Sequence, residues 1–275
     1  MNPVVVRGAG DLATGTIIRL TEAGYKVIIL ECGRPTAIRR EAAFCEAVYH
    51  GEKTVEGITC VRAESAEEAL KLAAPKRPVL LIDETGDSLA VIKPSVLVDA
   101  IIAKRNLGTT IDMADLTIGL GPGFTAGVDV NYVVETMRGH NLGRIIAEGS
   151  ALPNTGVPGA VAGHTADRVI HAPAAGRLHA LKQIADIVEI GEPIAEITDP
   201  ETGGVTVVPA SLTGVLRGIL PEGFDVPLGM KMADIDPRAA EQKNCFTVSD
   251  KARCIAGSVL ELVSAYEHGV LKESK

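Results

Sequence analysis

The first 110 residues alternate between short apolar runs and segments with helical spacing. Apolar runs at 4–7, 26–30, 79–82 and 96–98 predict buried strands, and the segments between them predict helices, the first of which stops at Gly24. Because helices that alternate with wholly apolar strands cover both faces of a parallel sheet, this order predicts a doubly wound α/β sheet. We expect a Rossmann-like nucleotide-binding domain over residues 1–165.

The pattern changes after Pro153, where short β-rich runs separated by Gly and Pro turns replace the helices. These runs repeat: 172–176, 188–191 and 194–197 are echoed by 209–214, 226–229 and 232–235. An approximate two-fold repeat of short strands resembles the barrel-sandwich of biotinyl and lipoyl carriers. We therefore expect a β-rich, barrel-sandwich-like C-terminal module over residues 166–240.

The tripeptide Met230-Lys231-Met232 also resembles those carriers, which present their acceptor lysine between methionines. The acceptor belongs on the hairpin that joins the two halves of the repeat. Here that hairpin is 199–204, which contains no lysine, whereas Lys231 opens the last strand of the second half. We expect neither biotin nor lipoate on this chain.

Residues 241–275 form the third predicted segment, a helix over 249–267 that closes the chain and packs on its body. Its apolar residues recur at helical spacing along one face; they are Ala252, Ile255, Ala256, Val259, Leu262 and Val263. Such a stripe predicts either a core contact or a dimer contact, so a homo-oligomer stays open.

Composition and charge narrow the function classes. The net charge is −8 without a basic run, and aromatic residues make up 3%, which argues against nucleic-acid binding. No apolar run approaches the roughly 18 residues that span a bilayer, and the start of the sequence shows no secretory signal, so we expect a cytoplasmic protein without a membrane partner. The five cysteines contain no C-x-x-C pair, and we expect neither a disulfide framework nor a metal site.

A dinucleotide fingerprint follows the first predicted strand. Gly8, Gly10 and Ala13 fit the spacing G-x-G-x-x-A before a helix, and Glu31 ends the next strand 21 positions after Gly10. Glycines in this context admit a pyrophosphate to the helix N-terminus, and the acid accepts from a ribose hydroxyl. We expect these residues and Asp11 to line a site for NAD or another nucleotide, although Asp11 is a negative charge beside the expected phosphate. The alternative is a fold of this kind that binds no nucleotide.

The stretch 116–149 carries a second candidate site. Gly121 and Gly123 lie in a glycine-rich loop after an apolar run, and Arg138, His140 and Arg144 follow the next apolar run. Exposed backbone N–H groups beside guanidinium forks suit a phosphate or a molybdopterin-like anion. The alternatives are a solvated hairpin tip and an arginine that pairs within the fold.

Seven stretches together resemble a known family: RGAGDLATG, PTAIRREAAFCEAVYHGEKTVEGI, VDAIIAKRNLGT, GLGPGFTAG, VVETMRGHNLGR, NTGVPG and VSDKARCIAGSVLE. They resemble the YqeB-type accessory proteins of selenium-dependent molybdenum hydroxylases, which are related to the XdhC/CoxF maturation factors. The resemblance implies a role in inserting or modifying the molybdenum cofactor, with a hydroxylase apo-enzyme as partner. It carries over no catalytic residue, so a sulfur or selenium relay through Cys32, Cys45 or Cys60 is only a hypothesis.

Three functions therefore stay open, and whether the chain is an enzyme stays open with them. The first is an accessory factor that acts on or delivers the molybdenum cofactor. The second is an NAD-dependent oxidoreductase of a small molecule, for which His140 is the candidate proton-transfer group. The third is a non-catalytic scaffold that keeps a Rossmann shell. Titration with NAD, NADP and molybdenum cofactor precursors distinguishes them.

Overall fold

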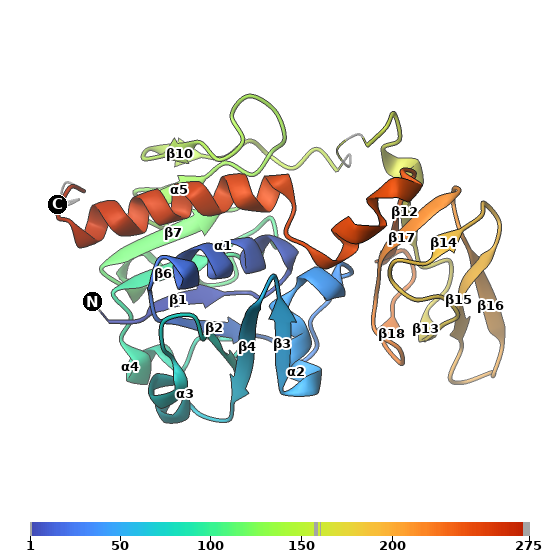
Figure 1. The fold of residues 1–275 in the computed structure, drawn as a ribbon, viewed down its shortest axis with the longest axis horizontal. Coiled ribbons are helices and arrows are strands. Elements are labelled where there is room, and N and C mark those ends of the chain that lie inside the picture. Colours follow the sequence, from blue (N-terminus) through green and yellow to red (C-terminus); the bar gives the residue numbers. More distant parts are fainter. Residues whose placement is uncertain (1, 157–158, 160, 272–275) are drawn as a thin grey trace. The chain divides into compact units, whose positions relative to one another are not determined.

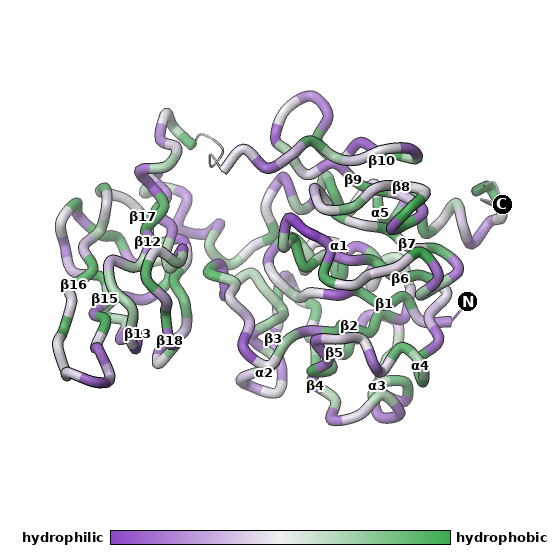
Figure 2. The backbone as a smooth tube through the Cα atoms, turned by 180° about the vertical axis from the view of Figure 1, so that it is seen from behind, coloured by the Kyte–Doolittle hydropathy of each residue, from purple (hydrophilic) through white to green (hydrophobic). Residues whose placement is uncertain are grey.

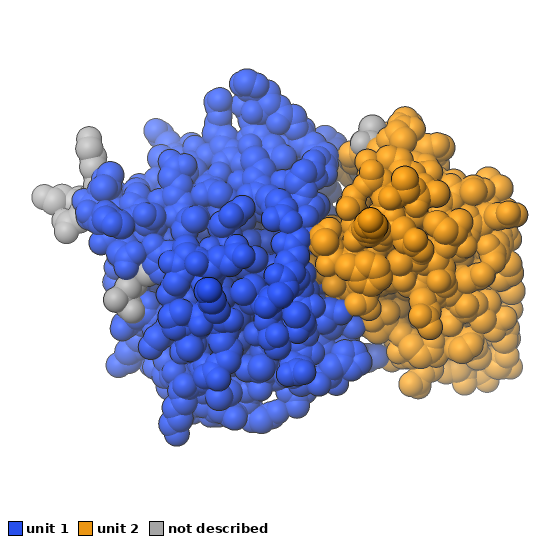
Figure 3. Space-filling model, in the orientation of Figure 1, with its two compact units in different colours: residues 1–35, 43–155, 248–275 blue, residues 36–42, 156–247 orange. Residues whose placement is uncertain are grey.

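The computed structural model describes residues 2–156, 159 and 161–271. They form two compact units (Figure 3). The first unit is built from residues 1–35, 43–155 and 248–275, and the second from 36–42 and 156–247. The chain thus passes between the units four times.

A nine-stranded sheet organises the first unit (Figure 1). Its strands are β1 (Val4–Arg7), β2 (Val27–Glu31), β3 (Glu52–Val55), β4 (Ile58–Ala63), β5 (Val79–Ile82), β6 (Val96–Asp99), β7 (Leu116–Leu120), β9 (Tyr132–Val134) and β10 (Ile145–Ile146). Their order is β10-β9-β7-β6-β1-β2-β5-β4-β3. The strands from β4 to β9 pair in parallel, whereas β3 and β10 pair antiparallel at the two edges.

The central strands are apolar up to their last, charged residue because both of their faces are covered. All four residues of β1 are buried, and so are all four of β6 and the first four of β2. Figure 2 colours the chain by the hydropathy of each residue. In a strand with one exposed face, apolar and polar residues would alternate. These apolar runs therefore correctly predicted strands that are buried on both faces. A small separate sheet pairs β8 (Thr125–Ala126) with β11 (Gly149–Ser150).

Two long helices, α1 (Asp11–Glu22) and α5 (Asp250–Glu267), lie side by side in the first unit (Figure 1). The shorter helices are α2 (Ala47–His50), α3 (Ala66–Leu72) and α4 (Leu89–Ile92), and the 3₁₀ turns of this unit are η2 (Phe44–Glu46) and η3 (Ile111–Met113). The predicted closing helix is confirmed. Ser249 caps it by accepting from the Ala252 N–H, and its whole apolar stripe is buried.

The second unit consists of two four-stranded antiparallel sheets. Its strands are β12 (Val169–His171), β13 (Gly176–Ala180), β14 (Ile187–Val188), β15 (Pro193–Thr198), β16 (Val205–Pro209), β17 (Gly214–Ile219), β18 (Asp225–Val226) and β19 (Lys231–Asp236). The sheet orders are β12-β19-β17-β14 and β16-β15-β13-β18. The 3₁₀ turns η1 (Arg40–Ala42), η4 (Ala166–Arg168) and η5 (Ala239–Phe246) also belong to this unit.

The internal repeat corresponds to six of these strands. β13, β14 and β15 have the same lengths and spacing as β17, β18 and β19, within one residue. The halves exchange their shortest strands, since β14 pairs with β17 and β18 pairs with β13. Lys231 begins β19, as the register of the repeat predicted.

The predicted fold class, a Rossmann-like domain followed by a barrel-sandwich-like module and a separate closing helix, was wrong. The large sheet is mixed, and between β6 and β7 the chain forms only η3 rather than a covering helix. The sequence from Ala37 to Val48 also predicts a helix. That helix does not form, because residues 36–42 leave for the second unit and only α2 remains α-helical. The chain is a mixed α/β protein with large sheets.

The unit boundaries differ from the expected divisions at 165/166 and 240/241. Residues 248–275 belong to the first unit, because the apolar stripe of α5 packs against α1 there. The second unit consists of residues 36–42 and 156–247. Its eight strands include β12 and β16, which lie outside the repeat.

Candidate functional site

Three charged residues occupy the last positions of neighbouring parallel strands in the first unit. Arg7 ends β1, Glu31 ends β2 and Asp99 ends β6, and Arg7 is in register with Asp99. The carboxyl ends of parallel strands meet at one edge of the sheet, which is where open α/β sheets bind their ligands. We call this the carboxyl edge.

A buried network braces the carboxyl edge. An Nη atom of Arg7 donates to Thr109 Oγ1 at 2.6 Å, and this hydroxyl donates to Asp99 Oδ2 at 2.6 Å. The other Nη of Arg7 donates to the Glu84 carbonyl at 3.0 Å. Burial raises the pKa of Asp99, against the opposing effects of Thr109 and Arg7. The network ties the loops that follow β5 and β6 to the end of β1.

Glu31 is oriented by the backbone on both of its oxygens. The Ala9 N–H donates to Oε2 at 2.7 Å, and the Cys32 N–H donates to Oε1 at 2.8 Å. These bonds hold the carboxylate beside the turn that leads into α1. Gly10 is the N-cap of α1 and supplies no side-chain cap.

Of the predicted fingerprint residues, Gly8 makes a close packing contact, whereas Asp11 and Ala13 lie in the first turn of α1. Gly8 has φ +96, and a Cβ there would lie 2.9 Å from the Ala100 carbonyl oxygen. This glycine therefore serves the close approach of the turn to the chain after β6. Asp11 is the first residue of α1 and Ala13 is buried within it.

Two glycines of the loop after β7, Gly121 and Gly123, lie in close contact with other residues of the first unit. A Cβ on Gly121 would lie 2.5 Å from Thr136 Oγ1, and one on Gly123 would lie 2.7 Å from the backbone of Arg105. Both have positive φ. The glycine density of this loop is therefore explained by close packing within the first unit.

The structure separates the three basic residues predicted after β9. Arg138 forms two bonds of 2.8 Å with the Asp250 carboxylate at the start of α5, which raises the pKa of Arg138. His140 and Arg144 are exposed on the hairpin between β9 and β10. The arginine that pairs within the fold was one of the stated alternatives for this stretch.

Glu135 points inward from the same segment. Its two oxygens accept from the Met137 and Leu152 N–H groups at 2.7 and 2.8 Å, and the residue is 3% exposed. Arg138 lies on the surface. The carboxylate is thus committed to the backbone.

Two of the three cysteines named for a relay, Cys32 and Cys60, have raised pKa values. Burial, and then the charge of Glu31, raises the pKa of Cys32 to about 11. Cys45 and Cys60 are buried, and burial also raises the pKa of Cys60. Because the thiolate is the nucleophile, neither Cys32 nor Cys60 has an activated sulfur in this arrangement. Across the part of the chain that the structure describes, no group of three or more His, Cys, Asp or Glu side chains could hold a metal ion.

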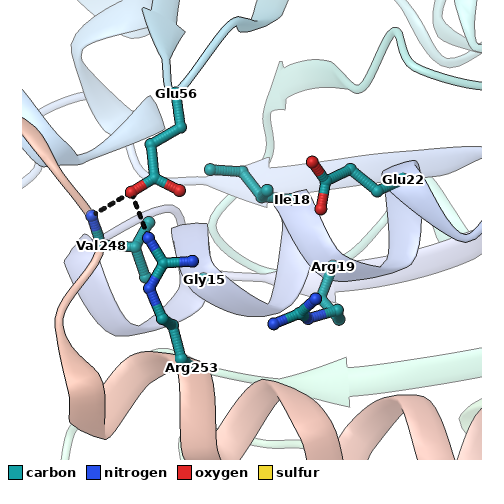
Figure 4. Close-up of a pocket in the computed structure, with 7 residues that line it drawn as sticks. All are labelled: Gly15, Ile18, Arg19, Glu22, Glu56, Val248 and Arg253. Atoms are coloured by element: carbon teal, nitrogen blue, oxygen red, sulfur yellow. Dashed lines mark hydrogen bonds and ion pairs between the residues drawn. The ribbon is translucent and has the colours of Figure 1, made fainter.

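A small hollow lies between α1, the β3–β4 turn and the start of α5 (Figure 4). Glu56 Oε1 accepts from the Val248 N–H at 3.0 Å and from an Nη atom of Arg253 at 2.6 Å. Arg19 and Glu22 line the same hollow from α1. The carboxylate joins the hairpin at the sheet edge to the start of α5, which is a structural role.

Sequence reasoning missed Arg7, Asp99 as a network member and Thr109. Arg7 gave a signal, because a charged residue that ends a wholly apolar strand is buried only when it is paired. Thr109 gave none, since its role depends on a loop reaching back to β1.

Comparison with known proteins gives one close sequence match. The chain is 49% identical over 272 residues to the uncharacterized protein YqeB of Escherichia coli (strain K12). This chain resembles YqeB. The match covers 99% of this chain and 49% of that protein, so the chain spans about half the length of the curated relative it matches. The YqeB-type resemblance is confirmed, and the molybdenum hydroxylase role that it implied stays a prediction. No protein-family model matches the sequence.

Solved structures match more weakly. They include the ectoine utilization protein EutE (DoeB) from Ruegeria pomeroyi, with 11% identity, TM-score 0.30 and 85% coverage of each chain. An aspartoacylase family protein from Mesorhizobium loti has 9% identity and TM-score 0.30, covering 86% of this chain and 85% of that one. Neither likeness is strong enough to assign this chain to the fold or the class of those proteins. Likenesses at this TM-score carry no argument about activity.

Within the described part of the chain, no helix combines the length and apolarity needed to cross a lipid bilayer.

Proposed function

We propose that the first unit binds a small anionic ligand with neighbouring hydroxyl groups, of the nucleotide class, at the carboxyl edge of its sheet. The observation that carries this proposal is the orientation of Glu31. Its carboxylate is fixed by the Ala9 and Cys32 N–H groups beside the uncapped start of α1.

The bonding capacity of Glu31 supports a diol. An ionised carboxylate offers about four lone-pair sites, and two backbone N–H groups occupy one on each oxygen. The remaining sites can accept from two hydroxyls of a ribose. Fixed geometry lowers the entropic cost of binding, because the acceptor does not have to be ordered when the ligand arrives.

The start of α1 supports the anionic part of such a ligand. The first N–H groups of a helix carry partial positive charge and have no partner within the helix. Gly10 gives them no side-chain cap. Glu31 would repel a phosphate on the ribose 2′ position, so the proposal favours NAD over NADP.

Isothermal titration of the purified chain with NAD, NADP and ADP-ribose tests this proposal. Glu31→Gln should weaken NAD or ADP-ribose about ten- to a hundredfold, the range for a hydrogen bond to a charged group. Glu56→Gln is the matched control, since Glu56 also accepts from a backbone N–H but lies at the α1–α5 hollow. NADP binding that ignores both substitutions would contradict the assignment of Glu31.

Service to a molybdenum hydroxylase is a further proposal, and it rests on the motif resemblance and the YqeB similarity. Its test is activation of a separately purified apo-hydroxylase by this chain, with and without molybdenum cofactor. Equal hydroxylase activity with wild-type chain, with Glu31→Gln and without the chain would reject an accessory role in that assay.

A further inference from the structure

The strand β16 is the last strand of its four-stranded sheet in the second unit, next to β15 (Figure 1). Its sequence, VTVVP, carries no charge. The side chains of Val205 and Val207 share one face of the strand and are 56% and 48% exposed, whereas Val208 on the other face is 1% exposed. This edge of the sheet therefore presents both apolar side chains and backbone to solvent.

The other edge strands of the described sheets are protected by charge or by shortness. β3 carries Glu52 and Lys53, and β12 has three residues and a shift in its register. β8, β10, β11, β14 and β18 have two residues each. Proteins use such features to prevent an edge from pairing with another chain. β16 has neither charge nor shortness, so it is the described edge that is suited to pairing.

The backbone of β16 alternates between β15 and the free edge. The Asp199 N–H donates to the Gly204 carbonyl at 2.9 Å, and Val205 follows opposite Thr198. Bonded and non-bonded residue pairs alternate along an antiparallel ladder. Because Gly204 is bonded to Asp199, the N–H and C=O groups of Val205 and Val207 point away from β15. They line the free edge as two donors and two acceptors.

We propose that the free edge of β16 binds β16 of a second copy of this chain, antiparallel about a two-fold axis. Val205 then lies opposite Val207 of the partner subunit, and Val207 opposite the partner's Val205, so four N–H···O=C bonds join the strands. Thr206 meets the partner's Thr206 on the axis as a non-bonded pair. This register uses no bond from Pro209, which has no N–H. The four valines cover one another on the exposed face.

Charge favours this orientation over a parallel one. The hairpin between β15 and β16 carries Asp199 and Glu201. In the antiparallel register, residues 199–204 lie beside positions 208–213 of the other copy, a stretch without a charged residue. A parallel pairing would instead place the two acidic hairpins side by side, where like charges repel. The uncharged strand and its flanks are thus complementary to a second copy of themselves.

The size of the interface sets the strength of the dimer. Stable complexes bury about 1,200 Å² or more in total, and two five-residue strands bury less than that. The net charge of −8 also makes two copies repel each other at long range. The dimer is therefore reversible, and its fraction rises with protein concentration. It is independent of the proposed nucleotide site, which belongs to the first unit.

Sedimentation velocity of the full chain across a wide range of concentrations tests the pairing. The wild type should shift from monomer towards dimer as its concentration rises. Val207→Lys should raise the dissociation constant of the dimer at least about tenfold, because an edge lysine opposes strand pairing. Leu228→Lys is the matched control, since Leu228 is an apolar residue of the same unit that is 70% exposed. It adds the same charge and should dimerise as the wild type does.

Thr206→Cys tests the register. The Cα atoms of a non-bonded antiparallel pair lie about 4.5 Å apart, which is within the range of a disulfide. Mild oxidation should therefore join two copies through the substituted position 206, and mass spectrometry of the linked peptides identifies the bond. Wild type, in which Cys254 is exposed, gives the background.

The outcomes decide the proposal in either direction. A wild type that stays monomeric at every concentration overturns it and leaves the edge to an unlike partner. A dimer that persists in Val207→Lys also overturns it, because the copies would then meet through another surface. A dimer that Thr206→Cys does not link overturns the antiparallel register. Thermal unfolding shows whether Val207→Lys is folded, and Val205→Lys repeats the test at the neighbouring valine if it is not.

Discussion

Gly15 of α1 and Ala252 of α5 meet so closely that a Cβ on Gly15 would lie 2.9 Å from the Ala252 Cβ and 3.0 Å from a methyl group of Val248. The same two helices meet again near their other ends, where the Tyr25 hydroxyl donates to Glu267 at 2.7 Å. α1 and α5 therefore run parallel, and both begin at the carboxyl edge. The first unit places two helix N-termini there because one glycine lets the helices approach.

Gly15→Ala should lower the free energy of unfolding by about 1–2 kcal/mol. Overpacking costs about 1–3 kcal/mol, and the better helix propensity of alanine returns up to about 1 kcal/mol. Gly257→Ala in α5 is the matched control, since a Cβ there meets no atom within 4 Å, and it should stabilise slightly. Urea unfolding measures both. If Gly15→Ala instead raised the free energy of unfolding, the prediction would be wrong, because α1 and α5 could then move apart without loss of stability.

Thr109→Val should destabilise the first unit by about 1–3 kcal/mol, because it leaves buried donors and acceptors of Arg7 and Asp99 without their bridge. Thr109→Ser keeps the hydroxyl and should cost less. The measurement is the urea midpoint of each variant. Equal midpoints for Val and Ser would mean that the hydroxyl contributes nothing.

Alkaline titration should expose the Tyr25–Glu267 contact. Burial, and then the bond to Glu267, raises the pKa of Tyr25 from 10.0 to about 12. Because the folded pKa is raised, this contribution to stability is complete below about pH 10 and is lost as pH rises towards 12. Tyr25→Phe should therefore lose less stability across that range than wild type. Tyrosinate absorbance measures the pKa of Tyr25, and thermal unfolding between these pH values measures the stability of both proteins. Identical stability profiles for wild type and Tyr25→Phe would contradict the prediction.

Glu56→Gln should destabilise the first unit by about 1–2 kcal/mol, because a neutral amide bonds the Val248 N–H and Arg253 less strongly than a carboxylate does. Arg253 is half-exposed, so most of the loss comes from the backbone bond. Arg253→Gln is the comparison and should cost less. Thermal unfolding compares the stability of Glu56→Gln and Arg253→Gln. A larger loss of stability for Arg253→Gln would mean that the bond to Arg253 contributes more than the bond to the Val248 N–H.

The sequence predicted those elements whose pattern is set locally. The apolar runs of β1, β2, β5 and β6 and the capped stripe of α5 were correct because burial on both faces, or on one helical face, leaves a period in the chain. The helix at 37–48 was not correct, since Pro35 is followed by residues that belong to the second unit. Which unit a segment joins depends on distant partners, and no local pattern records it.

For the candidate site, too, the sequence predicted what depends on local pattern and not what depends on distant residues. Glu31 was found from its position at a strand end, and the structure adds that the backbone holds it. Gly121 and Gly123 lie against neighbouring segments of the chain. A glycine required by a ligand and one required by a neighbouring segment look alike in sequence.

Because α1 packs against α5, the apolar face of α1 can be covered only after α5 has been synthesised. Residues 11–22 emerge early, but the helix that covers them is completed only at residue 267. At roughly 5–20 residues per second, the uncovered interval lasts on the order of ten to fifty seconds. Throughout that time an apolar helix face waits in solution while the whole of residues 156–247 is made and can fold. In the nascent chain this face of α1 therefore stays uncovered until α5 has been made.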